Sequence, residues 1–228
     1  MALDGITTSA IVSELKAALL GGRIDKIHQP LADEIRMSIR GLGSGAKKII
    51  ISANSAHPRI HLTESSRENP MTAPLFCMVM RKHIAGGKII DIVQPNFERI
   101  IILRIESANE MGDITTKNLI LEIMGKHSNI IFCDENDMIL DSIKHISAQV
   151  SSVREVLPGR TYFIPHSGEK KNPLEITEEE FIPLIQGTPQ PLSKALYMDL
   201  TGLSPVATSE ICHLASLDGD VSAKEFSE

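Results

Sequence analysis

The sequence of 228 residues contains no run of about 18 consecutive apolar residues, so we expect no membrane-spanning segment. Its start, MALDGITTSA, lacks the basic and then apolar stretches of a signal peptide. The three cysteines are far apart and form no C-x-x-C pair, which excludes a secreted disulfide framework and favours reduced, buried thiols. Together these absences predict a cytoplasmic protein.

The residue patterns that catalysis and metal binding require are missing as well. The eight histidines are scattered, and none forms an H-x-x-x-H pair with a carboxylate in helical register. No G-x-S-x-G elbow is present, and the loop GLGSGAKK (41–48) lacks the G-x-x-x-x-G-K-S/T pattern of a phosphate loop. We therefore expect no catalytic residue, no metal site and no cofactor, and we interpret the loop as a hairpin turn.

A net positive charge, the usual mark of a nucleic-acid partner, is absent too, because the net charge is −6. The charge is nevertheless unevenly distributed along the chain. Residues 1–105 carry 14 Lys and Arg against 9 Asp and Glu, whereas residues 106–228 carry 9 against 20. A mildly basic half is thus joined to an acidic half, and we expect a local basic face on an acidic protein.

The sequence does contain an internal repeat. GGRIDKIHQPLADEIRMSIR (21–40) aligns without a gap on GGKIIDIVQPNFERIIILRI (86–105), at an offset of 65 residues. Apolar residues at helical spacing precede each copy, over 8–20 and 75–85, and the alternation within the first copy is typical of half-buried strands. We infer one duplicated unit of helix, GG, strand, QP turn and strand, whose copies form a pseudo-symmetric sheet sandwich.

The order of the predicted strands and helices indicates two domains. The segments 118–125 and 129–146 predict two antiparallel strands joined by the turn DEND (134–137). From Asn172 the composition changes to three short helices, which places a boundary within 165–175. We expect an α+β fold, with a two-layer, mostly antiparallel β domain and packed helices over 1–170, followed by a small helical region over 171–228. The tail ends without a stop signal, which indicates a fragment of a longer protein.

Two pairs of charged residues are candidates for contact with nucleic acid. Arg81 and Lys82 close the second expected helix, where cations either stabilise a helix C-terminus or contact phosphates. Glu98 and Arg99 follow the second QP turn. They form either an edge ion pair or an arginine that grips a phosphate or base, with the carboxylate accepting hydrogen bonds from a base or a ribose hydroxyl.

Two further segments have the small and polar residues that contact RNA backbones. EIMGKHSN (122–129) places Lys126 and His127 between two apolar strands, and it is longer than a tight hairpin needs. DLTGLSPVATSEI (199–211) resembles a helix-hairpin-helix, in which backbone N–H groups bind phosphate. Any compact helical hairpin gives a similar pattern, so this second signal is weak alone.

A combination of motifs resembles one known domain: ALDG, ELKAALLGGRIDKIHQP, RIHLTE, NPMTAPLFCMVMRKHIAGGKI, QPNFERI, EIMGKHSNII, ILDSIKHI and VLPGRTY. This is the NFACT-N domain, also called the fibronectin-binding protein A N-terminal domain, of bacterial RqcH-type ribosome quality control proteins and their eukaryotic counterpart NEMF. The resemblance is dense over 1–165 and continues through the helix-hairpin-helix. NFACT-N resembles the N-terminal half of the Fpg/MutM DNA glycosylases, whose nucleophile is a proline after the initiator Met. Ala2 stands there, so we reject a glycosylase.

The resemblance implies a function in ribosome quality control. Members of the family bind the large ribosomal subunit obstructed by peptidyl-tRNA, and they recruit tRNA (alanyl-tRNA in bacteria) for template-free addition of C-terminal alanine tails. Peptidyl transfer belongs to the ribosome, so the protein is not expected to be an enzyme. The family's N-terminal acidic residue matches Asp4, and its Asp-Arg pair falls on Glu98-Arg99, with a longer carboxylate. The tRNA-binding residues expected in this way are Asp4, Glu98, Arg99, Arg81, Lys82, Lys126 and His127.

Two other functions stay open. The older family label suggests a surface adhesin that binds fibronectin, although the sequence shows no export signal or anchor. A fragment that only scaffolds the family's coiled coil and C-terminal domain is the third alternative.

Overall fold

The computed structural model of the protein describes residues 3–41, 43, 45–151, 153–165 and 169–226. Ala2, two positions of the loop 41–48 and residues 166–168, near the expected domain boundary, lie outside these ranges. The chain divides into two compact units. Unit 1 comprises Met1–Leu3, Ala10–Pro95 and Ile100–Ile164, and unit 2 comprises Asp4–Ser9, Asn96–Arg99 and Pro165–Glu228.

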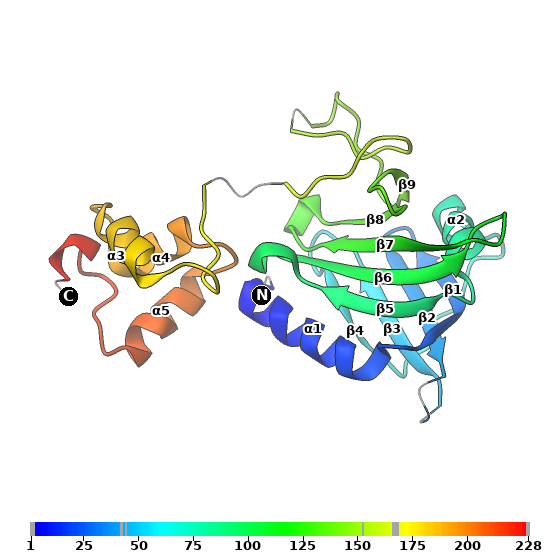
Figure 1. Ribbon diagram of the computed structural model, residues 1–228, viewed down its shortest axis with the longest axis horizontal. Helices are drawn as coiled ribbons and strands as arrows, with labels where there is room; N and C mark the ends of the chain where they lie inside the picture. The colour runs from blue at the N-terminus through cyan, green and yellow to red at the C-terminus, as the bar shows by residue number, and fades with distance from the viewer. Residues whose placement is uncertain (1–2, 42, 44, 152, 166–168, 227–228) are drawn as a thin grey trace. The chain divides into compact units, whose positions relative to one another are not determined.

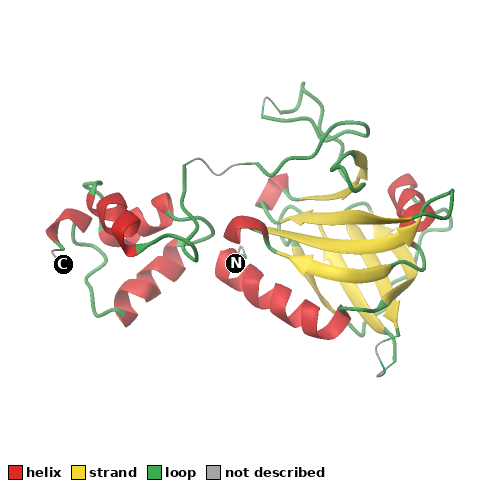
Figure 2. Cartoon of the chain, in the orientation of Figure 1, coloured by secondary structure: helices red, strands yellow, loops and turns green. Residues whose placement is uncertain are grey.

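Unit 1 is built around one sheet of nine strands in the order β4-β3-β2-β1-β5-β6-β7-β8-β9 (Figures 1 and 2). Every neighbouring pair in this order is antiparallel, which confirms the expected α+β class with a mostly antiparallel sheet. The strands are β1 (Arg23–Leu31), β2 (Glu34–Arg40), β3 (Lys47–Ser52), β4 (Arg59–Leu62), β5 (Lys88–Val93), β6 (Ile100–Ala108), β7 (Ile114–Glu122), β8 (Asn129–Cys133) and β9 (Ile139–Ser142).

The region 114–142 differs from the two strands expected there. It contains three strands, and the turn DEND joins β8 to β9. A short 3-10 helix, η2 (Gly125–His127), joins β7 to β8. The segment EIMGKHSN (122–129) therefore forms the connection between two separate strands, β7 and β8.

The two copies of the repeat meet at the centre of the sheet. Arg23 of β1 pairs with Lys88 of β5, and these residues are equivalent in the repeat. An antiparallel pair centred on equivalent residues has a local two-fold axis, so the expected pseudo-symmetry is present here. The backbone hydrogen bonds follow it: Gly21 N–H to Ile89 O with Gly86 N–H to Ile24 O, and Ile24 N–H to Gly87 O with Ile89 N–H to Gly22 O.

Beyond the QP turns the gapless alignment of the copies is wrong by one residue. His28 of β1 pairs with Arg36 of β2, whereas Val93 of β5, its equivalent, pairs with Ile102 of β6. The offset thus changes from 65 to 66, and Ile35 corresponds to Ile101. A slip of one residue moves every side chain of a strand to the other face. The second turn, which carries Glu98 and Arg99, is therefore the one with an inserted residue.

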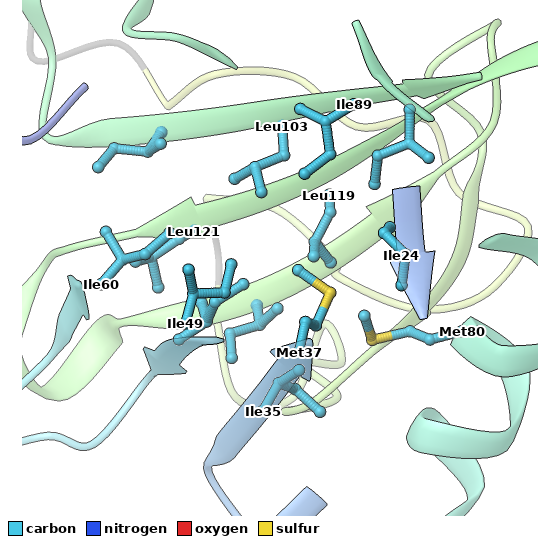
Figure 3. Close-up of a cluster of buried hydrophobic side chains, with 14 of the residues drawn as sticks. Ile24, Ile35, Met37, Ile49, Ile60, Met80, Ile89, Leu103, Leu119 and Leu121 are labelled. Atoms are coloured by element: carbon cyan, nitrogen blue, oxygen red, sulfur yellow. The ribbon is translucent and has the colours of Figure 1, made fainter. Parts of the chain in front are cut away.

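The two layers of the β domain are the two halves of this single sheet. Side chains of β3 and β4, such as Ile49 and Ile60, pack in the same buried cluster as Leu119 and Leu121 of β7 (Figure 3). Strands β3 and β8, which are far apart in the strand order, contact each other. The sheet therefore curves until its halves face each other across an aliphatic core, instead of forming two separate sheets.

Two helices pack in unit 1, although residues 5–9 of the first helix belong to unit 2. Helix α1 (Gly5–Leu19) begins three residues before the expected Thr8, because the Asp4 carboxylate accepts a hydrogen bond from Thr7 N–H and caps the helix earlier. Helix α2 (Leu75–Ile84) buries Phe76 and Met80 in the core. All three cysteines are buried, as expected.

Unit 2 contains the three short helices predicted after Asn172: α3 (Glu178–Gln186), α4 (Leu192–Asp199) and α5 (Pro205–Leu214). A capping box of Thr177 and Glu180 begins α3, and Ser204 begins α5 by accepting a hydrogen bond from Ala207 N–H. A small apolar cluster that includes Leu196 joins the helices. Within the described residues, no helix has both the length and the apolar character needed to cross a bilayer.

Candidate nucleic-acid interface

The turn between β5 and β6 carries Glu98 and Arg99 on a strained backbone. Asn96 and Phe97 have φ angles of 48° and 59°, in the left-handed region. Such angles cost non-glycine residues roughly 1–3 kcal/mol each, and they persist only where the surroundings impose them. Phe97 is 8% exposed as a residue, so its burial offsets part of this cost. The turn therefore has a defined shape, and Glu98 and Arg99, both half-buried, follow it directly.

Two glycines let the backbones of three distant segments meet at this turn. A Cβ atom on Gly5 would lie 2.6 Å from the carbonyl oxygen of Phe97 and 2.8 Å from the Cα of Gly202. A Cβ atom on Gly202, whose φ is +73°, would lie 2.2 Å from the same oxygen. Gly5 N–H donates a hydrogen bond to Gly202 O at 2.6 Å. The start of α1, the Glu98-Arg99 turn and the α4–α5 hairpin are thus packed at backbone contact within unit 2.

Asp4 connects two helix starts. One of its oxygens accepts the N–H of Thr7 at 2.8 Å, and the other accepts the hydroxyl of Ser204 at 2.8 Å. Ser204 in turn caps α5. Burial raises the pKa of the Asp4 carboxyl, but the hydrogen bonds from Thr7 and Ser204 outweigh it, and the pKa is lowered. The role that these contacts assign to Asp4 is to join the hairpin to residues 4–9 within unit 2, not to present a free carboxylate.

This arrangement predicts a pH dependence for the variant Asp4→Asn. A carboxyl with a lowered pKa in the folded state contributes stability above its unfolded pKa, and that contribution is lost as the pH falls through the folded pKa. We expect wild type to be more stable than Asp4→Asn at neutral pH, and the difference to close as the pH falls below the ordinary value of 3.8. Urea unfolding over a pH series measures the difference. A gap that stays constant into the acid range would contradict this role of the charge.

Arg99 is the cation that lies next to this turn. Its guanidinium has no hydrogen bond or ion pair with any residue in the described ranges. A planar guanidinium matches a phosphate with two parallel N–H···O bonds. An arginine without a partner among the described residues, held beside a turn of defined shape, is suited to bind an anion with little reorganisation. Its neighbour Glu98 is not free, because it already has an interaction within the protein.

The side chains of Arg81 and Lys82 both contact other residues of the protein. The Nε of Arg81 donates to Ile27 O at 2.8 Å, and one of its terminal nitrogens lies 3.4 Å from His28 Nδ1. Lys82 forms an ion pair with Glu110 at 2.6 Å, but both side chains are more than half exposed. An exposed pair of this kind adds little to stability and opens readily for a competing anion.

Lys126 and His127 lie on η2, in a loop with a firm internal scaffold. The hydroxyl of Ser128 accepts the N–H of Met124 at 2.8 Å. The ammonium of Lys144 donates to the carbonyl of Ser128 at 2.8 Å and also to that of Ala53. Partial burial lowers the pKa of Lys144. Lys144 therefore joins the end of β3 to the η2 loop.

We expect Lys144→Ala to destabilise the protein by about 2 kcal/mol, because it leaves two carbonyls without their charged donor. Chemical denaturation of the purified variant measures this. The matched control is Lys194→Ala, which removes an exposed lysine from α4 and is expected to change stability by less than about 0.5 kcal/mol. Equal stability of the two variants would contradict the proposed scaffold role.

The seven residues expected at the interface fall into two groups. Asp4, Glu98 and Arg99 belong to unit 2, where they gather around the turn. The other four, Arg81, Lys82, Lys126 and His127, belong to unit 1. Sequence reasoning missed Phe97, Gly202, Ser204 and Lys144, although the motifs QPNFERI, DLTGLSP and ILDSIKHI contain them. Among the described residues, no group of three or more His, Cys, Asp or Glu side chains is placed to hold a metal ion.

Comparison with known proteins gives consistent matches over nearly the whole chain. The Rqc2 homolog RqcH of Bacillus subtilis (strain 168) is 40% identical over 222 residues, which are 97% of this chain and 39% of that protein. The ribosome quality control complex subunit NEMF of Mus musculus is 26% identical over 204 residues, which are 90% of this chain and 18% of that protein. The chain thus spans well under half of the length of these relatives.

Solved structures agree. The crystal structure of the N-terminal domain of fibronectin-binding protein PavA from Streptococcus pneumoniae superposes with a TM-score of 0.85 at 36% identity, covering 93% of this chain and 79% of that one. A family model described as NFACT N-terminal and middle domains matches residues 4–228. The chain therefore belongs to the family of NFACT N-terminal and middle domains.

Proposed function

We propose that the chain is the RNA-binding N-terminal part of a ribosome-associated quality control factor. Its partners are a tRNA and the large ribosomal subunit that carries peptidyl-tRNA, and the factor recruits alanyl-tRNA for template-free C-terminal alanine tailing of stalled nascent chains. The observation that supports this most directly is Arg99, which lies on a strained turn and forms no hydrogen bond or ion pair with the residues that the structure describes. The 40% identity to the Rqc2 homolog RqcH of Bacillus subtilis supports the ribosomal setting.

The residues have distinct roles in this proposal. Arg99 binds a phosphate or a base edge of the tRNA through its guanidinium fork. Glu98 accepts hydrogen bonds from a ribose hydroxyl or a base amino group of the tRNA. Asp4 acts indirectly, by keeping the hairpin against the turn. Further contacts to phosphates come from unit 1, through Arg81, Lys82, Lys126 and His127.

The same proposal assigns no chemical step to the chain. Addition of an alanine to a stalled peptide is a peptidyl transfer, which the ribosome carries out. The factor contributes by binding and orienting RNA, and it acts in the cytoplasm, where stalled ribosomes are. It is therefore not an enzyme in this proposal, and it needs no cofactor.

The test is to sequence the RNA that is crosslinked to the protein in cells and co-purifies with it. We expect enrichment of tRNA, with alanine tRNA foremost, together with large-subunit ribosomal RNA. A filter-binding titration of the purified chain with tRNA should show an affinity that falls as salt rises, since phosphate contacts release counterions. Recovery of RNA with no enrichment of tRNA over a mock purification would contradict the proposal.

A second function is suggested by the structural relative from Streptococcus pneumoniae, PavA, which is described as a fibronectin-binding protein. In this alternative the chain is part of a surface adhesin. Protease treatment of intact cells distinguishes the two, because a cytoplasmic factor is protected and an adhesin is cleaved. Binding to immobilised fibronectin is the second readout, and only the adhesin alternative predicts it.

A further inference from the structure

A basic groove runs over the face of β1, β2 and β3 that points away from the core. Ile27, Met37 and Ile49 belong to the buried cluster of unit 1. Neighbouring residues along a strand point to opposite faces, so Lys26 and Lys48 lie on the outer side. The groove has a volume of about 250 Å³. Five of its lining side chains are cationic, Lys26, Arg36, Arg40, Lys48 and Arg67, and one of its described lining side chains is acidic, Asp25.

The strand register brings two of these lysines to the same place. Lys26 pairs with Ser38, and Ser38 pairs with Lys48, so the three residues form one row across the sheet. Strands are about 4.8 Å apart, which separates the lysine backbones by roughly 10 Å with a small hydroxyl between them. Both lysine side chains are exposed. They are thus placed to contact neighbouring anionic groups of one ligand.

The positive charge of the groove is only partly neutralised. Arg36 pairs with Glu34 at 2.8 Å, and Arg40 pairs with Asp25 at 2.9 Å. No acidic side chain in the described part of the chain lies within ion-pair distance of the remaining cations, Lys26, Lys48 and Arg67. A concave surface lined by charge of one sign concentrates the field and attracts counterions.

The groove continues toward α2. A second hollow of about 240 Å³ shares His28 and Asn69 with the first one, and it ends at Arg81. Burial lowers the pKa of His28, and the positive charges of Arg81 and Lys26 lower it further. Arg36 donates to the carbonyl of Ser65 at 3.1 Å, which fixes the wall of the groove. Because the two hollows adjoin, the cations that line them extend from Lys48 on β3 to Arg81 on α2 and do not surround a single point.

We propose that this groove binds the phosphodiester backbone of an RNA, at a site separate from the Arg99 turn. The inference rests on the proposed function for the choice of RNA as the polyanion. Apart from the imidazole of His28, the described lining residues include no aromatic ring on which a base stacks. Contacts to the backbone without base stacking are independent of sequence. The groove accordingly adds affinity and orientation, whereas the Arg99 turn contributes selectivity.

The test is the double variant Lys26→Gln/Lys48→Gln, with tRNA and a uridine homopolymer as probes in fluorescence anisotropy over a KCl series. We expect both RNAs to bind roughly tenfold more weakly, and the slope of log K against log salt to fall by about 1.5, because two phosphate contacts are lost. The matched control, Lys88→Gln/Lys194→Gln, removes the same charge from exposed positions outside the groove and is expected to leave the slope within about 0.3 of wild type. Thermal unfolding verifies that each variant is folded.

The outcomes separate the groove from the turn. Binding of both RNAs with wild-type affinity and slope by the groove variant would overturn the groove site, even if Arg99→Ala abolishes tRNA binding. Weaker binding by the groove variant alone, with Arg99→Ala unaffected, would support the groove and reject the proposed role of the turn. If the groove variant and its control lose RNA affinity equally, the loss is an effect of net charge alone, and this outcome would also overturn the site. A wild-type chain that binds neither RNA would overturn both proposals.

Discussion

Arg99→Ala is expected to weaken the binding of tRNA by roughly a hundredfold while leaving the protein folded. The guanidinium of Arg99 offers a fork of two charge-assisted hydrogen bonds to a phosphate, and loss of such a fork costs about 3 kcal/mol. Stability should change little, because the side chain makes no hydrogen bond or ion pair with the described residues. Equilibrium binding of tRNA at fixed salt measures the effect, and urea unfolding of the same preparation measures stability.

Two matched variants separate geometry from charge. Arg99→Lys keeps the charge and removes the fork, so it should recover part of the affinity but not all of it. Arg160→Ala removes an exposed arginine that pairs with the half-buried Glu155, and it should leave tRNA binding nearly unchanged. If Arg99→Ala binds tRNA as wild type does, the turn is not a tRNA contact and the proposed function loses its main support.

The central part of the fold could be predicted from the sequence because the chain repeats itself there. The glycine pairs and the first strands align, and in the structure the equivalent residues Arg23 and Lys88 face each other. The error of one residue after the QP turns has a physical cause. Strand β6 is apolar on both faces, since Ile100 and Ile101 belong to different buried clusters. A strand buried on both sides shows no alternation, so its register cannot be determined from the pattern.

The residues of the candidate site were only partly predictable, for a different reason. A motif that is contiguous in sequence, QPNFERI, indicates Glu98 and Arg99. The hydrogen bond between Asp4 and Ser204 joins residues 200 positions apart, and no local pattern indicates it. The approach of Gly5 and Gly202 to Phe97 is likewise a property of the backbone path. Contacts of this kind depend on tertiary structure alone, whereas capping and strand alternation are local.

Gly202→Ala is expected to have the largest effect on the architecture of the site. Gly202 has a φ of +73°, and a Cβ atom there would lie 2.2 Å from the carbonyl oxygen of Phe97, far inside van der Waals contact. The α4–α5 hairpin must then move away from the turn, which breaks the hydrogen bond from Gly5 N–H to Gly202 O. We expect a loss of about 3 kcal/mol or more in the free energy of unfolding, from backbone strain and steric overlap together. Urea unfolding of the purified variant measures it.

Gly21→Ala is the control that measures the cost of backbone strain without steric overlap. Gly21 has a similar φ of +83°, but a Cβ atom there would meet nothing within 4 Å. Gly21→Ala should therefore lose only about 1–2 kcal/mol, the cost of a left-handed alanine. The difference between the two variants measures the packing of the hairpin against the turn. Because that packing positions the residues before Arg99, Gly202→Ala should also weaken tRNA binding, whereas Gly21→Ala should not. Equal losses of stability in the two variants, with tRNA binding intact in both, would show that the hairpin and the turn are not packed in this way.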